Sequence, residues 1–265
     1  MASEKPTLVF IPGAWHTPEY FEGVISQLKA HGYPVRALRM PSVGGDDTST
    51  MADDAAYIQK TTSALAAEGK EIILVMHSYG GIPGTQSAKG LLQKERAAEG
   101  QRGGIIGLVY LAAFLLPAGQ SLASFLGSMP DWVKYNGNRM TADRTPSIMY
   151  NDLPADEAES WASKTLYHAA PSFETPLTYP AYHHVPVTYL QCENDQAIPF
   201  AAQHAMVKIA GEGVTTHVCG AGHSPMLSMP ETVVKVIRQA AGETMAYKDE
   251  RGRHRIGGRY INLIP

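Results

Sequence analysis

Short apolar runs recur along the chain, and polar or turn-forming residues follow each of them. Apolar runs without alternating polar residues are typical of strands that are buried on both faces of a parallel sheet. Between these runs, apolar residues recur at the spacing of helices that bury one face. The pattern predicts strands over 7–11, 33–40, 71–76, 104–112, 185–191 and 214–218, and helices over 22–31, 51–68, 79–98, 201–210 and 230–241. Strands that alternate with helices predict an α/β fold with a mostly parallel central sheet and helices on both faces.

Local signals mark the ends of two of these helices. Gly32 directly follows the first helix and is expected to be its C-cap. Thr50 precedes the second helix as an N-cap, and Asp53 and Asp54 suit the positive end of the helix dipole in its first turn.

The alternation breaks between residues 114 and 182. This stretch is rich in proline, holds short helical pieces such as 154–164, and is too long for an ordinary loop in such a sheet. We therefore predict a core of residues 1–113 and 183–245, with 114–182 inserted as a cap over the carboxyl edge of the sheet, where ligands bind in open α/β sheets. A loose surface insertion is the alternative, but five aromatic residues in it need burial: Phe125, Trp132, Trp161, Tyr167 and Phe173.

Residues 246–265 form a C-terminal extension of another character, which is basic, contains glycine and has no periodicity. A disordered extension, a segment packed on another subunit and an artificial remnant are all compatible with this composition. We assign the extension no function.

Length and composition narrow the class of protein. A chain of 265 residues suits one large α/β domain with an insertion. The net charge of −3 offers no electrostatic footprint for nucleic acid or an anionic membrane, so we expect a small, uncharged or weakly charged partner. A homo-oligomer stays open. No apolar stretch reaches the length of a secretory or membrane-spanning segment, which predicts a cytoplasmic protein.

Cys192 and Cys219 are too few for a disulfide framework. We expect buried, reduced thiols, although the two would meet if their strands were neighbours. The ten histidines are scattered without the spacing of metal ligands, so the sequence predicts no metal site.

The stretch VMHSYGG at residues 75–81 carries a candidate nucleophile, Ser78. A serine projected from a tight strand-to-helix turn needs small neighbours, which Gly80 and Gly81 supply. The backbone N–H of Tyr79, at the new helix N-terminus, is a candidate oxyanion donor. Met76 departs from the pattern, because glycine usually stands two residues before such a serine. A structural serine in a tight turn is the alternative.

A serine hydroxyl needs a base to remove its proton and a carboxylate to orient that base. Asp195 follows the predicted strand 185–191, and His223 lies in a glycine-rich loop after strand 214–218. Glu193 and Asp131 are alternatives for the acid. His77 is interpreted as a packing residue under the turn, because adjacent positions diverge at a strand-to-helix junction.

The loop after the first strand is expected to supply the second oxyanion donor. Gly13 permits close backbone approach there, and the N–H of Ala14 is our candidate. Trp15 and His16 would flank a substrate pocket or serve as packing residues. Further candidates for the pocket are Phe125, Met129, Trp132, Trp161 and Met226, which favour an apolar or aromatic substrate, unless they only attach the cap to the core.

Together these residues resemble the α/β-hydrolase superfamily, over nearly the whole chain to about Gly242. The resemblance rests on PGAWHTPEYF, HSYGG, NDQAIP and GAGHSPMLSMPE. Within the superfamily, the chain is similar to the small-esterase branch that also holds plant methylesterases and hydroxynitrile lyases. That branch usually shows HGAWH where this chain has Pro12-Gly-Ala-Trp-His16. The lyases carry a threonine after the first strand and a lysine close to the histidine, and this chain has Gly13 and no lysine at 220–225.

This resemblance implies a serine hydrolase that cleaves a carboxylic ester or a lactone without a cofactor. Two alternatives stay open at this point. One is a cofactor-independent lyase or isomerase that uses the same three residues, and the other is a ligand-binding receptor built on a hydrolase pocket.

Overall fold

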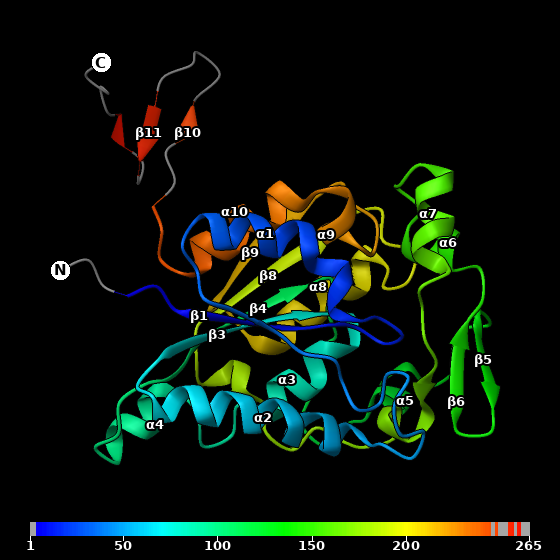
Figure 1. Cartoon of the computed structure of the whole chain (residues 1–265), viewed down its shortest axis with the longest axis horizontal. Coiled ribbons are helices and arrows are strands. Elements are labelled where there is room, and N and C mark those ends of the chain that lie inside the picture. The colour runs from blue at the N-terminus through cyan, green and yellow to red at the C-terminus, as the bar shows by residue number, and fades with distance from the viewer. Residues whose placement is uncertain (1–3, 245–246, 249–253, 257–258, 261–265) are drawn as a thin grey trace.

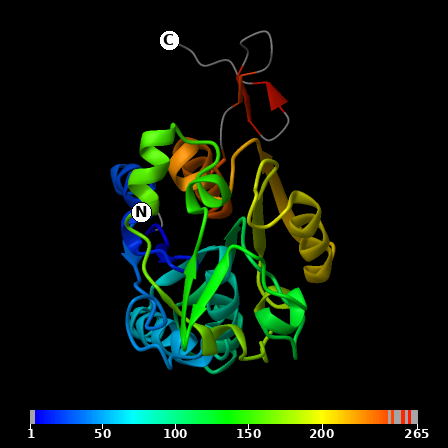
Figure 2. The same cartoon turned by 90° about the vertical axis from the view of Figure 1, so that its right-hand side faces the viewer.

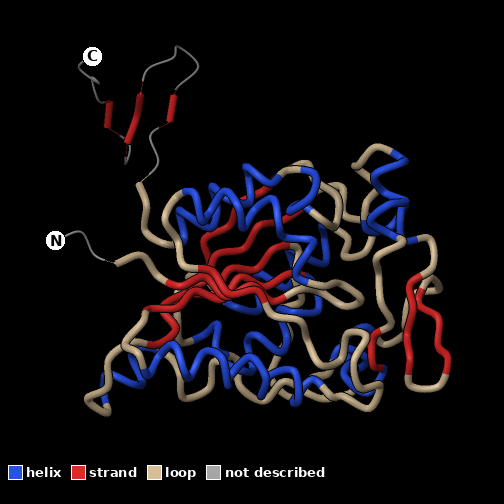
Figure 3. Tube along the Cα trace, in the orientation of Figure 1, coloured by secondary structure: helices blue, strands red, loops and turns tan. Residues whose placement is uncertain are grey.

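A computed structural model describes residues 4–244, 247–248, 254–256 and 259–260. A six-stranded sheet with the order β2-β1-β3-β4-β8-β9 runs through its centre, and all its neighbouring strands are parallel. Figure 3 shows this sheet in red between two layers of helices. Its strands are β1 (Thr7–Ile11), β2 (Val35–Ala37), β3 (Glu71–His77), β4 (Gly104–Leu111), β8 (Val187–Cys192) and β9 (Val214–Cys219). The predicted α/β fold is confirmed.

Helices cover both faces of the sheet (Figure 1). Successive side chains of a strand point to opposite faces, so Leu8 and Phe10 pack in one core cluster and Val9 and Ile11 in the other. The first cluster lies under α1 (Glu22–Ala30) and α10 (Pro230–Ala240), and the second under α2 (Met51–Ala67), α3 (Gly81–Ser87) and α8 (Phe200–Ala210). Shorter helices join the layers: η1 (Pro18–Phe21), η2 (Ser78–Gly80), α4 (Gln93–Ala98) and α9 (Pro225–Ser228).

The predicted N-cap at Thr50 is confirmed, whereas the C-cap of α1 is His31 and the predicted Gly32 directly follows it. The Thr50 hydroxyl accepts the N–H of Asp53, whose carboxylate in turn accepts the N–H of Thr50, so the two form a capping box. Gly32 has a φ of 81°, and its N–H donates to the carbonyl of Lys29 at the end of α1. A residue with a side chain would be strained in that conformation.

Two predicted elements are shorter than their patterns indicate. The predicted strand 33–40 contains only the three residues of β2, because β2 is an edge strand between Pro34 and Pro41. The predicted helix 79–98 is split, because Gly90 takes a φ of 74° and Leu91 accepts the N–H of Ile105 at the start of β4. Tertiary pairing with β4 therefore overrides the helical pattern.

Residues 114–182, the insertion, connect β4 to β8. Figure 2 looks onto this side of the molecule, with the β5–β6 hairpin in front. The expected helical piece at 154–164 is present as α7. The three-stranded antiparallel sheet β5-β6-β7 was not predicted, since its strands are too short to show periodicity. The elements are α5 (Leu122–Leu126), β5 (Val133–Asn136), β6 (Arg139–Ala142), α6 (Thr145–Met149), α7 (Ala155–Ala162), β7 (His168–Ala169), η3 (Ala170–Phe173) and η4 (Ala181–His183).

Cys192 and Cys219 are register partners at the ends of β8 and β9. Both are buried free thiols, as expected, and because their strands are neighbours their sulfur atoms lie 3.8 Å apart.

Near the C-terminus, three short strands pair in an antiparallel sheet, and the other residues predicted as an extension, within 246–265, lie outside the described residues. The strands are β10 (Tyr247–Lys248), β11 (His254–Ile256) and β12 (Arg259–Tyr260). No helix in the described part of the chain has both the length and the apolar character that crossing a membrane requires.

Candidate active site

Ser78 stands at the turn between β3 and α3, at the carboxyl end of the central strand. Its φ of 51° lies in the left-handed region, which costs a non-glycine residue roughly 1–2 kcal/mol. The Ser78 carbonyl accepts the N–H of Phe114, which follows β4, at 3.0 Å. The neighbouring strand therefore helps to hold a strained turn that projects the hydroxyl away from the sheet.

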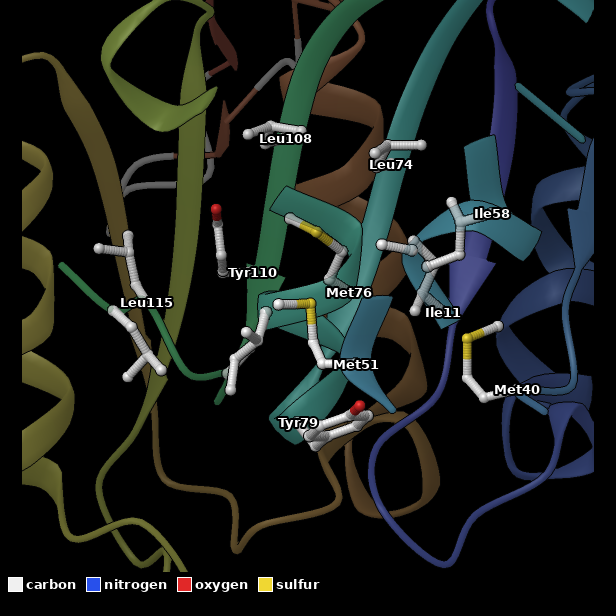
Figure 4. Packing of buried hydrophobic residues seen from close by; sticks show 14 of the residues in the cluster. Ile11, Met40, Met51, Ile58, Leu74, Met76, Tyr79, Leu108, Tyr110 and Leu115 are labelled. Atoms are coloured by element: carbon white, nitrogen blue, oxygen red, sulfur yellow. The ribbon is translucent and has the colours of Figure 1, made fainter. Parts of the chain in front are cut away.

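The neighbours of the turn show why small residues occupy it. A Cβ on Gly80 would lie 2.5 Å from the carbonyl oxygen of Pro12, and one on Gly81 would overlap the carbonyl oxygen of Phe114. Met76 is accommodated because Gly84 of α3 leaves space where a Cβ would overlap the Met76 sulfur. Figure 4 shows Met76 within this buried layer. Gly84, at the end of the first turn of α3, thus compensates for the methionine that stands where glycine is usual.

The structure brings Ser78, His223 and Asp195 together from three separate loops. Ser78 Oγ lies 3.0 Å from Nε2 of His223, and Nδ1 of the same imidazole lies 2.9 Å from Oδ2 of Asp195. All three residues are buried. An ionised carboxylate only accepts hydrogen bonds, so Nδ1 carries the proton and Nε2 is free to accept the serine proton.

Asp195 is held more tightly than either rival carboxylate. Its Oδ1 accepts the N–H groups of Ala197 and Ile198, both at 2.8 Å, and its Oδ2 accepts the Gln203 amide at 3.0 Å. Glu193 is exposed, and the exposed Asp131 pairs with Arg144. Among the three candidate acids, Asp195 therefore has the geometry that the chemistry needs.

His77 has a larger role than the packing we expected. Its Nε2–H donates to the carbonyl oxygen of His223 at 2.8 Å. Burial lowers the pKa of His77 well below its usual value, and the neighbouring His223 and His16 lower it further. A neutral imidazole under the turn thus supports the backbone of the candidate base, a role that the sequence alone did not indicate.

Ala14 and Tyr79, the candidate oxyanion donors, are both buried beside Ser78 and line the same cavity. Gly13 brings their loops together, since a Cβ there would lie 2.7 Å from Cβ and 3.3 Å from Oγ of Ser78. Within the described residues, the backbone N–H groups of Ala14 and Tyr79 form no hydrogen bond with a carbonyl of a turn or loop. The arrangement is compatible with two amides directed at a developing oxyanion.

The side chain of Tyr79 joins a buried polar network that sequence reasoning missed. Its hydroxyl donates to Oδ2 of Asp54 at 2.8 Å, and Ser42 donates to the same carboxylate through its hydroxyl and its N–H. Burial raises the pKa of Asp54 to about 6, and the hydrogen bonds from Ser42 and Tyr79 oppose that rise. Asp54 was interpreted as a helix-dipole residue. Its place in the first turn of α2 was the only signal in the sequence, and it does not indicate that Tyr79 is the partner of Asp54.

A narrow cavity of about 40 Å³ opens at Ser78 and His223. Three predicted pocket residues line it, namely Trp15, Met129 and Trp132. Trp15 also ties the loop after β1 to the insertion, because its indole N–H donates to the carbonyl of Met140. Nine further lining residues, all apolar, come from the insertion and from the loop that carries Asp195 (the acid loop): Phe114, Leu122, Leu126, Pro130, Val133, Met149, Phe173, Ala197 and Ile198.

Four predicted pocket residues lie elsewhere and do not line this cavity. Phe125 packs on the edge of the core, and the ring of Trp161 contacts that of Tyr20 in a tilted arrangement, with the ring centroids 4.9 Å apart. Met226 is buried on the opposite face of the sheet. His16 donates from Nδ1 to the carbonyl of Ala14 at 2.6 Å and accepts the hydroxyl of Tyr150 at Nε2. It thereby holds the loop after β1, while burial lowers its pKa to about 4.

The missed lining residues could not be found from periodicity. Leu122, Met149 and Phe173 lie in short elements of the insertion, where no repeating pattern separates inward from outward positions. Within the described residues, no group of three or more His, Cys, Asp or Glu side chains is arranged to hold a metal ion.

Comparisons with known proteins agree with this geometry. The family model described as the alpha/beta hydrolase family matches residues 8–236. Alpha/beta hydrolase nvfD of Aspergillus novofumigatus is 33% identical over 249 residues, covering 91% of this chain and 98% of the relative. Methyl jasmonate esterase 1 of Vitis vinifera is 23% identical over 258 residues, covering 87% and 94%.

The fold is shared with a solved structure as well. The pyrethroid hydrolase from Sphingobium faniae JZ-2 superimposes with a TM-score of 0.70 at 23% identity, covering 89% of this chain and 97% of the other. The predicted resemblance, including its esterase branch, is confirmed. The chain belongs to the alpha/beta hydrolase family.

Proposed function

We propose that this protein is a serine hydrolase that cleaves a carboxylic ester or lactone of a small apolar or aromatic substrate. The observation that carries the proposal is the buried chain of hydrogen bonds from Ser78 through His223 to Asp195, which opens into an apolar cavity. Two of the relatives support hydrolysis of an ester bond. Alpha/beta hydrolase nvfD aligns with nearly the full chain, and methyl jasmonate esterase 1 is named for an ester substrate.

In the first half of the reaction, Nε2 of His223 takes the hydroxyl proton of Ser78 while Oγ attacks the carbonyl carbon. The carbonyl electrons move to oxygen, and the N–H groups of Ala14 and Tyr79 stabilise the resulting oxyanion. The imidazolium then protonates the departing alcohol oxygen. The carboxylate of Asp195 stabilises the imidazolium and keeps Nδ1 protonated throughout.

In the second half, His223 removes a proton from water, which attacks the acyl-serine carbonyl. The tetrahedral intermediate collapses, the acid leaves, and the proton returns to Ser78 Oγ. No other group is needed to balance the reaction. A lactone would follow the same steps, with the alcohol and the acid staying in one molecule.

The cavity favours a neutral substrate, because none of the described lysine, arginine, aspartate or glutamate residues lines it. A volume of about 40 Å³ accepts only a small group beside the nucleophile without rearrangement. A larger aromatic group has to displace lining side chains, and the unbranched Met129 is the most adaptable of them. We therefore propose an ester whose acyl or alcohol part next to the carbonyl is small and apolar.

The test compares Ser78→Ala with wild type and with Ser160→Ala, an exposed serine of α7. Short and aromatic esters, methyl esters and lactones are assayed, and the intact mass is recorded after rapid acid quenching. We expect wild type and Ser160→Ala to turn over an ester and show the acyl adduct, while Ser78→Ala loses roughly 10⁴-fold or more in kcat. A folded Ser78→Ala variant with near-wild-type turnover contradicts the proposal. Turnover without any trapped adduct favours the lyase or isomerase alternative.

A further inference from the structure

The loop that carries His223, residues 219–223, has little side-chain material to hold it. Gly220 and Gly222 have no side chains, and Ala221 has only a methyl group. Such a loop is flexible unless its backbone groups are bound elsewhere. The position of the imidazole relative to Ser78 therefore depends on which groups bind this backbone.

Three hydrogen bonds to the backbone of residues 219–223 come from the neighbouring loop that carries Asp195. The N–H of Glu193 donates to the carbonyl of Cys219 at 2.9 Å. Asn194 donates twice, from its side chain to the carbonyl of Gly220 at 2.8 Å and from its backbone to Ala221 at 3.1 Å. A fourth bond comes from His77 beside the nucleophile. The loops of the acid and the nucleophile thus hold the loop of the base.

The fifth bond has a different origin. Oδ2 of Asp152, in the turn between α6 and α7 of the insertion, accepts the N–H of Gly222 at 2.6 Å. The preceding residue, Asn151, donates from its side chain to the carbonyl of Asn194 at 3.0 Å. Two adjacent insertion residues therefore contact the residue before His223 and the residue before Asp195.

The fit at this point is close. A Cβ on Gly222 would overlap Oδ1 of Asn151 and lie 2.7 Å from Oδ1 of Asp152. Asp152 is half-buried and Asn151 is exposed, so the pair reaches inward from the surface of the insertion. Among the described residues, no other member of the insertion forms a hydrogen bond with the backbone of residues 219–223.

We propose that Asn151 and Asp152 form a clamp that positions His223 and Asp195. The hydrogen-bonded relay from Ser78 through His223 to Asp195 therefore depends on how the insertion packs against these two loops. The inference rests on the proposed serine-hydrolase function. Both are positioning residues, because they act through the backbone of the two loops and touch neither Ser78 nor the cavity. When the turn between α6 and α7 moves away, the Gly222 N–H loses its acceptor and the imidazole loses its alignment.

The experiment measures kcat, KM and the rate of Ser78 labelling by a fluorophosphonate for Asp152→Ala, Asp152→Asn and Asn151→Ala. Labelling by this probe reports the reactivity of the serine without dependence on a chosen ester. The matched control is Asp156→Ala, an exposed carboxylate of α7 in the same insertion.

We expect Asp152→Ala to lower kcat and the labelling rate by a similar factor, roughly 10- to 100-fold, since misplacing a catalytic group by about 1 Å costs about 10²-fold. KM should change by less than about twofold, because the cavity lining is intact. Asp152→Asn keeps an oxygen acceptor for the Gly222 N–H and should recover most of the loss. Asn151→Ala should lower both rates by a smaller factor, and Asp156→Ala should match wild type.

Rates for Asp152→Ala and Asn151→Ala that both equal those of Asp156→Ala would overturn the clamp. Equal losses in Asp152→Ala and Asp152→Asn would overturn it too, because they would assign the effect to the charge. If Asp152→Ala does not fold, the exposed Asn151→Ala still decides the question, with thermal unfolding as the check. A wild-type protein that is neither labelled at Ser78 nor active refutes the proposed function instead, so the two failures are distinguishable.

Discussion

The acid loop and the base loop are neighbours on β8 and β9, yet they position their side chains in opposite ways. The carboxylate of Asp195 is itself bound by two backbone N–H groups and by Gln203. Within the described part of the chain, the imidazole of His223 forms hydrogen bonds with Ser78 and Asp195 alone, and its loop is held through the backbone.

The difference follows from what each group does in the proposed reaction. The acid has only to stay in place and orient the base, so direct bonds to its oxygens are an advantage. The base has to accept and release protons and therefore needs both ring nitrogens. Its position has to be set without occupying them. Breaking either arrangement should affect catalysis by a different route.

The largest effect is expected from Asp195→Asn. The amide oxygen will face the N–H groups of Ala197 and Ile198, which leaves the amide NH₂ directed at Nδ1 of His223. That donor favours the wrong imidazole tautomer, so kcat should fall by about 10⁴-fold. Ester turnover measures it, with Asp131→Asn, a rival carboxylate from the sequence, as the control. Loss in the Asp131 variant and not in the Asp195 variant would transfer the acid role.

A second prediction concerns the glycines of the base loop. Gly222→Ala should push the loop away from Asn151 and Asp152 and lower kcat by roughly 10- to 100-fold. Gly220→Ala is a matched control, because its Cβ would meet only the Asn194 side chain, at 3.9 Å. Parallel kinetics and circular dichroism of the two variants test this. Equal losses would show that loop flexibility matters more than the close fit.

The acid loop offers a smaller change through Gln203. Gln203→Leu removes the amide that donates to Asp195 Oδ2 and the oxygen that accepts the N–H of Cys192. We expect a loss of about 1–3 kcal/mol in the free energy of unfolding. The accompanying fall in kcat should be only about tenfold, since the two backbone N–H donors to the carboxylate remain. Urea unfolding and ester turnover measure both, and the exposed Gln196→Leu is the comparison.

The last prediction concerns stability, which should depend on pH through His16. His16 is buried with its pKa lowered from 6.5 to about 4, so the unfolded chain takes up its proton first as pH falls. Full stability is present above pH 6.5, and about 3 kcal/mol is lost between pH 6.5 and 4 through this group alone. Below pH 4 the folded protein binds the proton as well and the loss stops.

The measurement is the free energy of unfolding against pH for wild type, His16→Gln and the exposed His183→Gln. His16→Gln should reduce the slope in this window by up to about 1.4 kcal/mol per pH unit, and His183→Gln should not. An unchanged slope in His16→Gln would mean that this histidine takes up its proton at the same pH in the folded and the unfolded chain.

Much of the fold was predictable, because buried parallel strands are continuous apolar runs. The predicted strands at 71–76 and 185–191 appear as β3 and β8 with nearly the same ends. The candidate site was predictable in part for the same reason, since Ser78, Asp195 and His223 each follow such a strand. What failed were short elements, such as β2 and the strands of the insertion, where few residues leave no period to detect.

The sequence by itself determined the layered architecture and the chain positions from which the three relay residues emerge. It could do so because hydrophobic periodicity and turn residues act locally along the chain. Only the tertiary structure decided which acid meets His223, that His77 and Asp152 hold its loop, and that Asp54 faces Tyr79 rather than solvent. Each of these depends on atoms distant in sequence meeting within about 3 Å, a condition that no local pattern encodes.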